Sequence, residues 1–275
     1  MNPQFSITDD LSEKIKRERE FHNEWAKSIR VEDLFVRESF EALTAIENQY
    51  VLKELGDLHG KKILDLGCGA GESSVYLALC GARVSACDIA EDFLALGRSL
   101  AGKFGVAVDF AQADTARLPY ADETFDLVYG NGILHHVELA PTIQEIRRVL
   151  KKGGKAAFIE PLPYNPIINV YRWMARGVRT DDEKPLTFAQ FRTLQEYFSE
   201  VRHEEFWLLS LVIFFHFFFV RRWHPSKVRY WKKVIEAADD YKTLFPKWQK
   251  IDHSLLRLLP FLRRLCWNSV LIGIK

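Results

Sequence analysis

Short apolar runs alternate with amphipathic stretches through the middle of the chain. Gly or Asp stops each run, a pattern typical of strands buried in a parallel sheet. Strand and helix in alternation give βαβ units whose helices cover both faces of the sheet, so we predict an α/β fold. The strands are expected at residues 62–67, 83–88, 107–111, 125–130 and 155–160, and the helices at 72–79, 91–104 and 140–150.

The two ends of the chain depart from this alternation. Residues 11–55 place apolar side chains at helical spacing, which predicts two or three helices. The lysines and glycines of residues 151–154 predict a helix stop before the fifth strand. After Pro161 we expect helices at 167–175 and 188–197, a strand from 200 to about 209, and a last strand at 267–274. The predicted parts are an N-terminal helical cap at 1–55, the core at 56–209, a helical insertion at 210–264, and the final core strand at 265–275.

Composition bounds the class of protein. A chain of 275 residues with 48% hydrophobic and 27% charged residues can bury a full core. Its four cysteines show neither a CxxC pair nor a histidine at zinc spacing, so we expect reduced thiols and no metal site. Residues 1–10 lack a basic stretch followed by an apolar run, which predicts no secretory signal and a cytoplasmic location.

The first predicted strand ends in a glycine-rich turn. Gly67, Gly69 and Gly71 stand at alternate positions, where the backbone can turn sharply and a ligand can approach a helix N-terminus. Asp88, at the end of the second strand, lies 23 residues after Asp65. A carboxylate at this position can accept hydrogen bonds from both hydroxyl groups of a ribose. The glycine run and the acid together predict a nucleotide-type cofactor. They do not choose between an adenosyl methyl donor and a nicotinamide cofactor.

A family resemblance makes that choice. Residues 65–71, Asp-Leu-Gly-Cys-Gly-Ala-Gly, resemble motif I of class I S-adenosylmethionine methyltransferases, and nicotinamide dehydrogenases lack the set of segments that follows. The resemblance covers roughly residues 60–162 and is closest to the group that includes the ubiquinone and menaquinone biosynthesis methyltransferases. It implies a Rossmann-like, seven-stranded, mostly parallel sheet. The segments that carry it further are Ala111-Gln112-Ala113-Asp114 with Leu118-Pro119-Tyr120, residues 125–129, Leu134-His135-His136-Val137, and residues 146–154.

The resemblance also implies a set of cofactor contacts. Gly67, Gly69 and Gly71 would border the methionine part of S-adenosylmethionine, and Asp65 would hold the glycine loop or the cofactor amine. The remaining contacts would be Asp88 and Ile89 at the ribose, Asp114 and Thr115 at the adenine, and Gly130 and Asn131 on the methionine side.

Catalytic and acceptor residues are expected on the same rim. A sulfonium donor is already activated, so a general base is needed only if the acceptor loses a proton as it attacks. His135 and His136 follow the fourth strand and are candidates for that base, the alternative being that one of them only caps or packs a helix. Glu160, at the end of the fifth strand, is a further candidate. Acceptor contacts are expected from Tyr164, Asn165, Tyr171 and Arg172.

Aromatic residues of the N-terminal helices have two interpretations. They could form a lid over the cofactor, or they could be ordinary core, which is the more common fate of aromatic side chains at helical spacing. The residues concerned are Phe21, Trp25, Phe40 and Tyr50.

The C-terminal quarter is unlike the rest of the chain. Residues 206–275 hold 13 basic against 4 acidic residues, a net charge of +9, whereas the remainder carries −8. Residues 206–220 carry no charge but are shorter than the ~20 residues of a spanning helix, and a basic, aromatic segment follows at 221–233. Apolar and basic residues side by side predict peripheral membrane contact through 206–233 and a small lipophilic or amphipathic acceptor.

Other interpretations of this quarter stay open. The apolar run could be buried in its own core or in a homodimer interface, and the basic cluster could bind a soluble anionic metabolite. A nucleic-acid partner is disfavoured, because nucleic-acid interfaces are wet and polar. A cofactor-binding module without enzymatic activity remains the alternative from another functional class.

Overall fold

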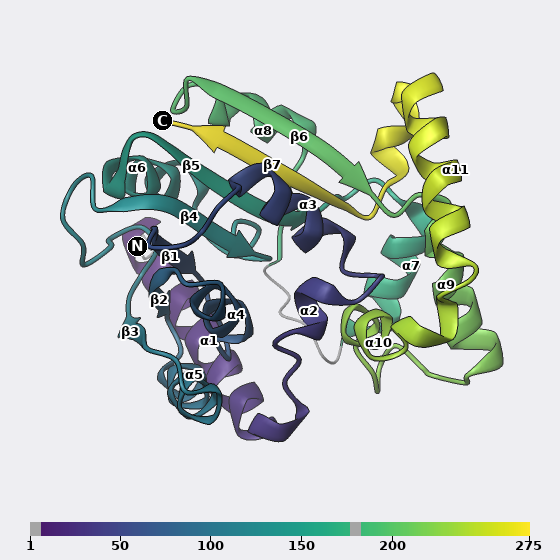
Figure 1. Ribbon diagram of the computed structural model, residues 1–275, viewed down its shortest axis with the longest axis horizontal. Coiled ribbons are helices and arrows are strands. Elements are labelled where there is room, and N and C mark those ends of the chain that lie inside the picture. The colour runs from purple at the N-terminus through teal and green to yellow at the C-terminus, as the bar shows by residue number, and fades with distance from the viewer. Residues whose placement is uncertain (1–6, 177–182) are drawn as a thin grey trace, which may run out of the picture.

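A seven-stranded sheet forms the centre of the computed structural model, which describes residues 7–176 and 183–275 (Figure 1). The strand order is β3-β2-β1-β4-β5-β7-β6. Neighbours from β3 to β5 run parallel, and β7 runs antiparallel to both β5 and β6. The predicted α/β class with a mostly parallel, seven-stranded sheet is therefore confirmed. The strands are β1 (Lys62–Leu66), β2 (Arg83–Asp88), β3 (Val108–Gln112), β4 (Phe125–Asn131), β5 (Leu150–Pro161), β6 (Glu200–Phe206) and β7 (Asn268–Ile274).

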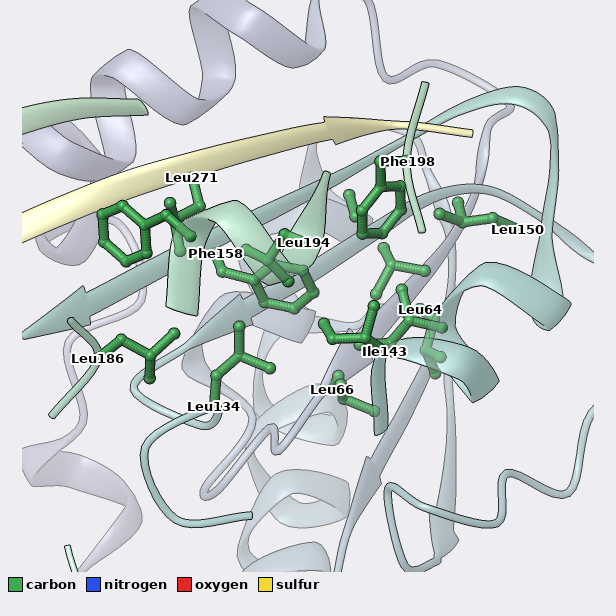
Figure 2. Packing of buried hydrophobic residues seen from close by; sticks show 14 of the residues in the cluster. Leu64, Leu66, Leu134, Ile143, Leu150, Phe158, Leu186, Leu194, Phe198 and Leu271 are labelled. Atoms are coloured by element: carbon green, nitrogen blue, oxygen red, sulfur yellow. The ribbon is translucent and has the colours of Figure 1, made fainter. Parts of the chain in front are cut away.

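Helices cover both faces of the sheet. One face packs against α6 and α8, where Leu64 and Phe158 of the sheet meet Ile143 and Leu194 of these helices (Figure 2). The other face packs against α3, α4 and α5. Strands buried on both faces read as continuous apolar runs, which is why β1 and β4 were recognisable in the sequence. These helices are α3 (Ile46–Leu55), α4 (Glu72–Leu79), α5 (Glu91–Phe104), α6 (Leu139–Val149) and α8 (Phe188–Leu194).

The N-terminal part is helical, as its spacing predicts. A long helix, α1 (Ile7–Lys27), lies along α5, and the short α2 (Glu38–Glu41) leads into α3 (Figure 1). The division of the chain into four parts stays a prediction.

Two boundaries differ from the predictions. The segment 151–154 is not a helix stop, because β5 already begins at Leu150 and Gly153, with a φ of +72°, lies in an irregular stretch of that strand. Lysines followed by glycines occur both at the ends of helices and at β-bulges, so the sequence does not distinguish the two structures. The pairing of Phe125 with Leu150 shows that this segment already belongs to the strand. The strand expected to reach residue 209 ends at Phe206, after which the chain turns at Trp207 with a φ of +68°.

The insertion before β7 is a group of short helices at the right of Figure 1, next to α7 (Pro166–Met174). Its apolar run forms a 3₁₀ turn (Leu209–Leu211), α9 (Val212–Phe215) and a π-helical turn (His216–Val220). The remainder contains α10 (Tyr230–Glu236), α11 (Phe245–Leu258) and two 3₁₀ segments, Ala238–Tyr241 and Pro260–Leu265. Asp252 on α11 ties the group together, because its carboxylate accepts hydrogen bonds from the backbone N–H groups of Leu208, Leu209 and Ser210.

Candidate active site

A cavity of about 560 Å³ lies at the carboxyl ends of the parallel strands. Ligands of open α/β sheets bind at this edge, because the strand-to-helix loops converge there. Loops after β1, β2, β3 and β4 form one side of the cavity, and residues of α1, α7, α10 and β7 form the other. Twelve of the predicted site residues line it: Asp65, Gly67, Gly69, Asp88, Ile89, Asp114, Thr115, Asn131, His135, His136, Tyr171 and Arg172.

The glycines of the first loop have different roles. Gly69 has a φ of +52°, and a Cβ at this position would meet no atom within 4 Å, so it leaves open space on the cavity side. A Cβ on Gly67 would lie 2.5 Å from Ile133, and one on Gly71 would lie 3.1 Å from Gly97. Gly69 therefore makes room for a ligand, whereas Gly67 and Gly71 also permit close packing.

Asp88 holds the glycine loop in place. Its Oδ2 accepts a hydrogen bond from Gly69 N at 2.9 Å, and its Oδ1 accepts one from Ala90 N at 3.0 Å. Each carboxylate oxygen keeps a second acceptor position, and the residue lines the cavity. The side chain can therefore accept hydroxyl hydrogens while it fixes the loop.

Asp65 is buried at the end of β1 beneath the same loop. Ser74 of α4 donates a hydrogen bond to its Oδ2 at 2.5 Å. Burial raises the pKa of Asp65 to about 7, and the negative charge of Asp88 acts in the same direction. A ligand ammonium group in the cavity would supply a cationic partner for this carboxylate.

The loop after β3 contributes a carboxylate and a hydroxyl. Asp114 Oδ1 accepts from Ala116 N at 2.9 Å, which orders the loop. Thr115 is buried and shares a 3.0 Å hydrogen bond with Thr142 of α6. Asn131, at the end of β4, is exposed to the cavity.

His135 and Glu160 form a buried pair. Glu160 is fully buried, and its Oε2 lies 2.7 Å from His135 Nδ1, while its Oε1 accepts from the backbone N–H groups of Ile133 and Leu134. A carboxylate at Nδ1 favours the tautomer that leaves Nε2 as a proton acceptor. Burial lowers the pKa of His135 and outweighs the opposing effect of Glu160, so the ring is neutral at neutral pH.

His136 faces the N-terminal helix instead. Its Nδ1 lies 3.5 Å from Glu18 Oε2 on α1, and His22 Nε2 lies 3.3 Å from the same oxygen. Neither contact has the geometry of a hydrogen bond, so the buried Glu18 carboxylate lacks a hydrogen-bond partner. Burial alone would raise the pKa of Glu18, but His136 and His22 hold it well below its ordinary range.

Five predicted site residues do not line the cavity. Glu160 acts through His135, as described above. Gly130 is a packing position, since a Cβ there would lie 2.8 Å from Ile133. Tyr164 faces α8, where its hydroxyl accepts from Phe188 N at 3.1 Å, and Asn165 caps α7 by accepting from Ile167 N at 2.8 Å. Gly71 begins α4 behind the loop. A position near a strand end does not fix the direction of a side chain, which explains these differences.

The N-terminal aromatics divide between the two interpretations. Phe21 and Trp25 line the cavity, and Trp25 packs edge-on against Phe93 at a centroid distance of 5.3 Å. Phe40 is core, stacked on Tyr76 at 4.1 Å, and Tyr50 packs against Phe206 outside the cavity.

The far side of the cavity is apolar and aromatic. Ile168 and Tyr171 of α7 line it together with Trp207, Val234 and Trp267, all of them buried. We call these five residues the aromatic chamber. The basic residues nearby are already engaged: Arg172 donates to the Leu162 carbonyl, Lys232 donates to the Asp33 carbonyl, and the Arg229 guanidinium lies 3.7 Å from the centre of the Trp25 ring.

Several residues that line the cavity were not among the site residues predicted from the sequence. Glu18 and His22 stand four residues apart on a helix, a spacing that puts both side chains on one face, and this signal was available. Glu47 is a buried acid of the cavity wall that accepts from Asn268 Nδ2 at 2.6 Å, and burial raises its pKa. Only the fold brings Glu47, Trp207 and Asn268 together.

Part of the chain is similar to known methyltransferases. Residues 64–158 match the family model described as a methyltransferase domain. The chain is 43% identical over 103 residues, 37% of this chain and 41% of the other, to demethylmenaquinone methyltransferase of Clavibacter sepedonicus. It is 30% identical over 163 residues, 58% of this chain and 40% of the other, to sterol 24-C-methyltransferase ERG6B of Gibberella zeae. The chain thus spans about two fifths of the length of these curated relatives.

A solved structure shares the fold. Phosphoethanolamine N-methyltransferase 2 of Haemonchus contortus, solved with phosphomonomethylethanolamine and S-adenosylhomocysteine, superposes with a TM-score of 0.56 at 18% identity. The match covers 84% of this chain and 52% of that one. Residues 64–158 therefore match a methyltransferase domain and are similar to a quinone biosynthesis methyltransferase, and the sheet around them has the fold of a solved methyltransferase.

Proposed function

We propose that this protein transfers the methyl group of S-adenosylmethionine to a small lipophilic or amphipathic acceptor, and that it does so at a membrane surface. The observation that carries the proposal is the cavity itself. It joins the glycine loop and its acids, on one side, to the aromatic chamber on the other. A methyl donor and an apolar acceptor can meet within one enclosed space.

The cofactor side fits the donor group by group. The open space beside Gly69 accepts the methionine backbone, and Asp65 offers the carboxylate that its ammonium requires. Asp88 accepts from the ribose hydroxyls, and Asp114 lies on the loop that meets the adenine. When bound, S-adenosylmethionine supplies a methyl group already activated by the positive sulfur.

The acceptor side favours a lipophilic molecule. The aromatic chamber offers rings and aliphatic groups, and the nearby basic side chains are held by protein partners. Because the aromatic chamber itself contains no cationic side chain, a soluble anionic metabolite would gain little from it. The names of two relatives, a sterol and a demethylmenaquinone methyltransferase, refer to lipophilic acceptors, which supports the same choice.

His135 is proposed as the general base for an acceptor that loses a proton. It is neutral at neutral pH, lines the cavity, and is oriented by Glu160 through Nδ1. Glu160 is a positioning residue in this scheme, because it reaches the cavity only through the imidazole.

Exposed apolar side chains support the membrane location. Among the side chains whose exposure the structure describes, every exposed large hydrophobic one lies between positions 167 and 265. On α9 and the turn after it, Val212, Phe215 and Phe219 share one face at helical spacing, and on α7 Val170 and Trp173 are exposed on the side away from the chamber. In the part of the chain that the structure describes, we find no helix with the length and apolar character needed to cross a bilayer. A monotopic contact is the mode that fits both facts.

Some residues of the predicted basic surface form ion pairs within the protein. Arg221 pairs with Asp240 at 2.5 Å and Lys233 pairs with Glu236 at 2.6 Å. Arg222 and Lys227 are exposed beside the apolar face and remain candidates for lipid phosphates.

The test is a transfer assay with methyl-labelled S-adenosylmethionine. Demethylmenaquinone in anionic phospholipid vesicles and a panel of water-soluble anionic metabolites are offered in parallel. We expect label in the vesicle lipid fraction and none in the soluble panel. Label only in the soluble panel would contradict the proposed class of acceptor. Binding of the cofactor without transfer of label to either fraction would favour a binding module without enzymatic activity.

A further inference from the structure

A cluster of metal-binding side chains forms part of the cavity wall. Glu18 and His22 come from successive turns of α1, and His136 comes from the loop after β4. Their nearest ligand atoms all lie within 4.8 Å of one another. Two imidazoles and one carboxylate are a donor set that first-row divalent metals take in proteins.

The distances within the cluster suit an ion better than they suit direct contacts. Glu18 Oε2 lies 3.3 Å from His22 Nε2 and 3.5 Å from His136 Nδ1. Zinc bonds of about 2.0–2.1 Å in a tetrahedron place neighbouring ligand atoms about 3.3–3.4 Å apart. Octahedral coordination at the same bond length would bring them to about 2.9 Å. The two separations from Glu18 Oε2 to the imidazole nitrogens match a tetrahedral edge, and all ligand atoms of the group lie within 4.8 Å of one another.

Unsatisfied polar atoms point to the same position. Glu18 is only 7% exposed, yet neither carboxylate oxygen has a hydrogen-bond partner, and His136 Nδ1 also lacks one. Buried polar atoms are nearly always bonded, so an orphaned carboxylate facing two imidazoles requires an explanation. An ion between them would satisfy all three groups at once.

We propose that Glu18, His22 and His136 bind one divalent transition-metal ion, with Zn²⁺ the best fit to the geometry. Three protein ligands leave a fourth position, and because all three residues line the cavity, that position faces the ligand space. The cysteine spacing led us to expect no metal; this site uses no cysteine, and its ligands come from segments more than a hundred residues apart. His136 also belongs to a second group of possible ligands, with His135 and Glu183. The Glu18 group is the better site because both oxygens of its buried carboxylate lack a hydrogen-bond partner.

The consequence for the reaction rests on the proposed function. A metal with an open position beside the methyl-donor site would hold an acceptor through an oxygen atom. It would thereby favour oxygen-bearing acceptors such as hydroxylated quinones over hydrocarbons. Binding of the ion itself does not depend on this consequence.

The site is tested by metal binding rather than by activity. Untagged protein, stripped with a chelator, is titrated with Co²⁺ and with Zn²⁺ at pH 7.5. We expect one ion per chain, with the visible absorption of tetrahedral Co²⁺, and displacement of Co²⁺ by Zn²⁺. Glu18→Gln, His22→Gln and His136→Gln should each weaken Zn²⁺ binding by at least about 100-fold, because even the loss of an outer-shell partner costs ~10–100-fold.

The matched control is His253→Gln, an exposed histidine on α11 that should leave metal affinity unchanged. Affinity for S-adenosylhomocysteine reports that each variant is folded. If a variant does not fold, imidazole nitrogen NMR of the wild type replaces it: Zn²⁺ should shift the signals of His22 and His136 but not of His253. Failure of the wild type to bind either ion, or equal binding by Glu18→Gln, would overturn the proposal. Because cofactor binding is measured separately, that result would leave the proposed function standing.

Discussion

The sheet and the insertion bury their apolar residues differently. In the sheet, Leu64, Val128 and Ala156 are fully enclosed between two layers of helices. In the insertion, one set of apolar side chains packs inward around Phe217 and Tyr230, while another, including Phe219 and Leu258, is 58% and 76% exposed. The sheet region resembles an ordinary protein core, whereas the insertion keeps a second apolar face toward its surroundings.

This difference corresponds to two parts of the proposed site, one for the cofactor and one for the acceptor. The cofactor side is built from backbone turns and acids that any S-adenosylmethionine enzyme of this fold can use. The acceptor side is built from α7 and the insertion, whose inner face forms the aromatic chamber and whose outer face is apolar. Under the proposed function, methyl transfer depends on the first region and access of the acceptor on the second.

Replacement of His135 by Gln should remove the base from the sheet region. We expect kcat to fall by about 100-fold to 10,000-fold with S-adenosylmethionine affinity unchanged. Because burial holds the pKa of His135 below its ordinary value, wild-type activity should stay level above about pH 6.5 and decline only in more acid solution. Folding stability should also fall below that pH, since the unfolded chain then binds the proton more readily. A pH profile of kcat checks this, and an unchanged acidic limb in His135→Gln would contradict it.

Leu64→Ala and Phe219→Ala compare the two apolar environments directly. Leu64 is fully buried beside Phe158 and Ile143, so its truncation should cost about 2–5 kcal/mol of unfolding free energy (Figure 2). Phe219→Ala should change that free energy by no more than about 0.5 kcal/mol. Urea unfolding measures both. A large loss in Phe219→Ala would mean that its face is covered by a partner subunit.

Asp88→Ala should weaken S-adenosylmethionine binding by about 100-fold. It removes the acceptor of the ribose hydroxyls and the hydrogen bonds from Gly69 N and Ala90 N, and charge-assisted bonds are worth about 1.5–3 kcal/mol each. Isothermal titration measures the change, with the exposed Asp109→Ala on β3 as the matched control. Equal affinity in the two variants would remove Asp88 from the pocket.

Phe215→Asp combined with Phe219→Asp should reduce sedimentation with anionic vesicles by about 10-fold, because each change places a charge on the apolar face. The fold should be unaffected. Ser99→Asp on α5 adds the same type of charge to the sheet region and should leave sedimentation unchanged. Wild-type protein that stays in the supernatant at moderate salt would refute the membrane contact.

Asp65 should make cofactor affinity mildly dependent on pH. Its pKa of about 7 means that roughly half of the chains carry a neutral carboxyl at neutral pH, whereas a bound ammonium requires the ionised form. S-adenosylmethionine affinity should therefore rise severalfold between pH 6 and pH 8, with proton release. Titration in two buffers of different ionisation enthalpy detects that release. Asp65→Asn, which cannot titrate, should bind weakly and without this dependence.

Much of the sheet region could be predicted from the sequence alone. Apolar runs buried on both faces are continuous, so β1, β2 and β4 were recognisable, and Gly69 and Asp88 are close to their strand ends. Local periodicity and the short distance from a strand to its loop determine these features. The same locality explains why twelve predicted residues line one cavity.

Only the tertiary structure decided what lies opposite the cofactor loop. Trp207, Trp267 and Glu47 belong to segments far apart in the sequence, and no local pattern relates them. The direction of Tyr164 and Asn165, away from the cavity, follows from the packing of α7 and α8 rather than from their place after β5. Glu18 and His22 acquire meaning only when α1 brings them to His136. Sequence thus determined the donor side through short-range order, whereas long-range packing determined the acceptor side.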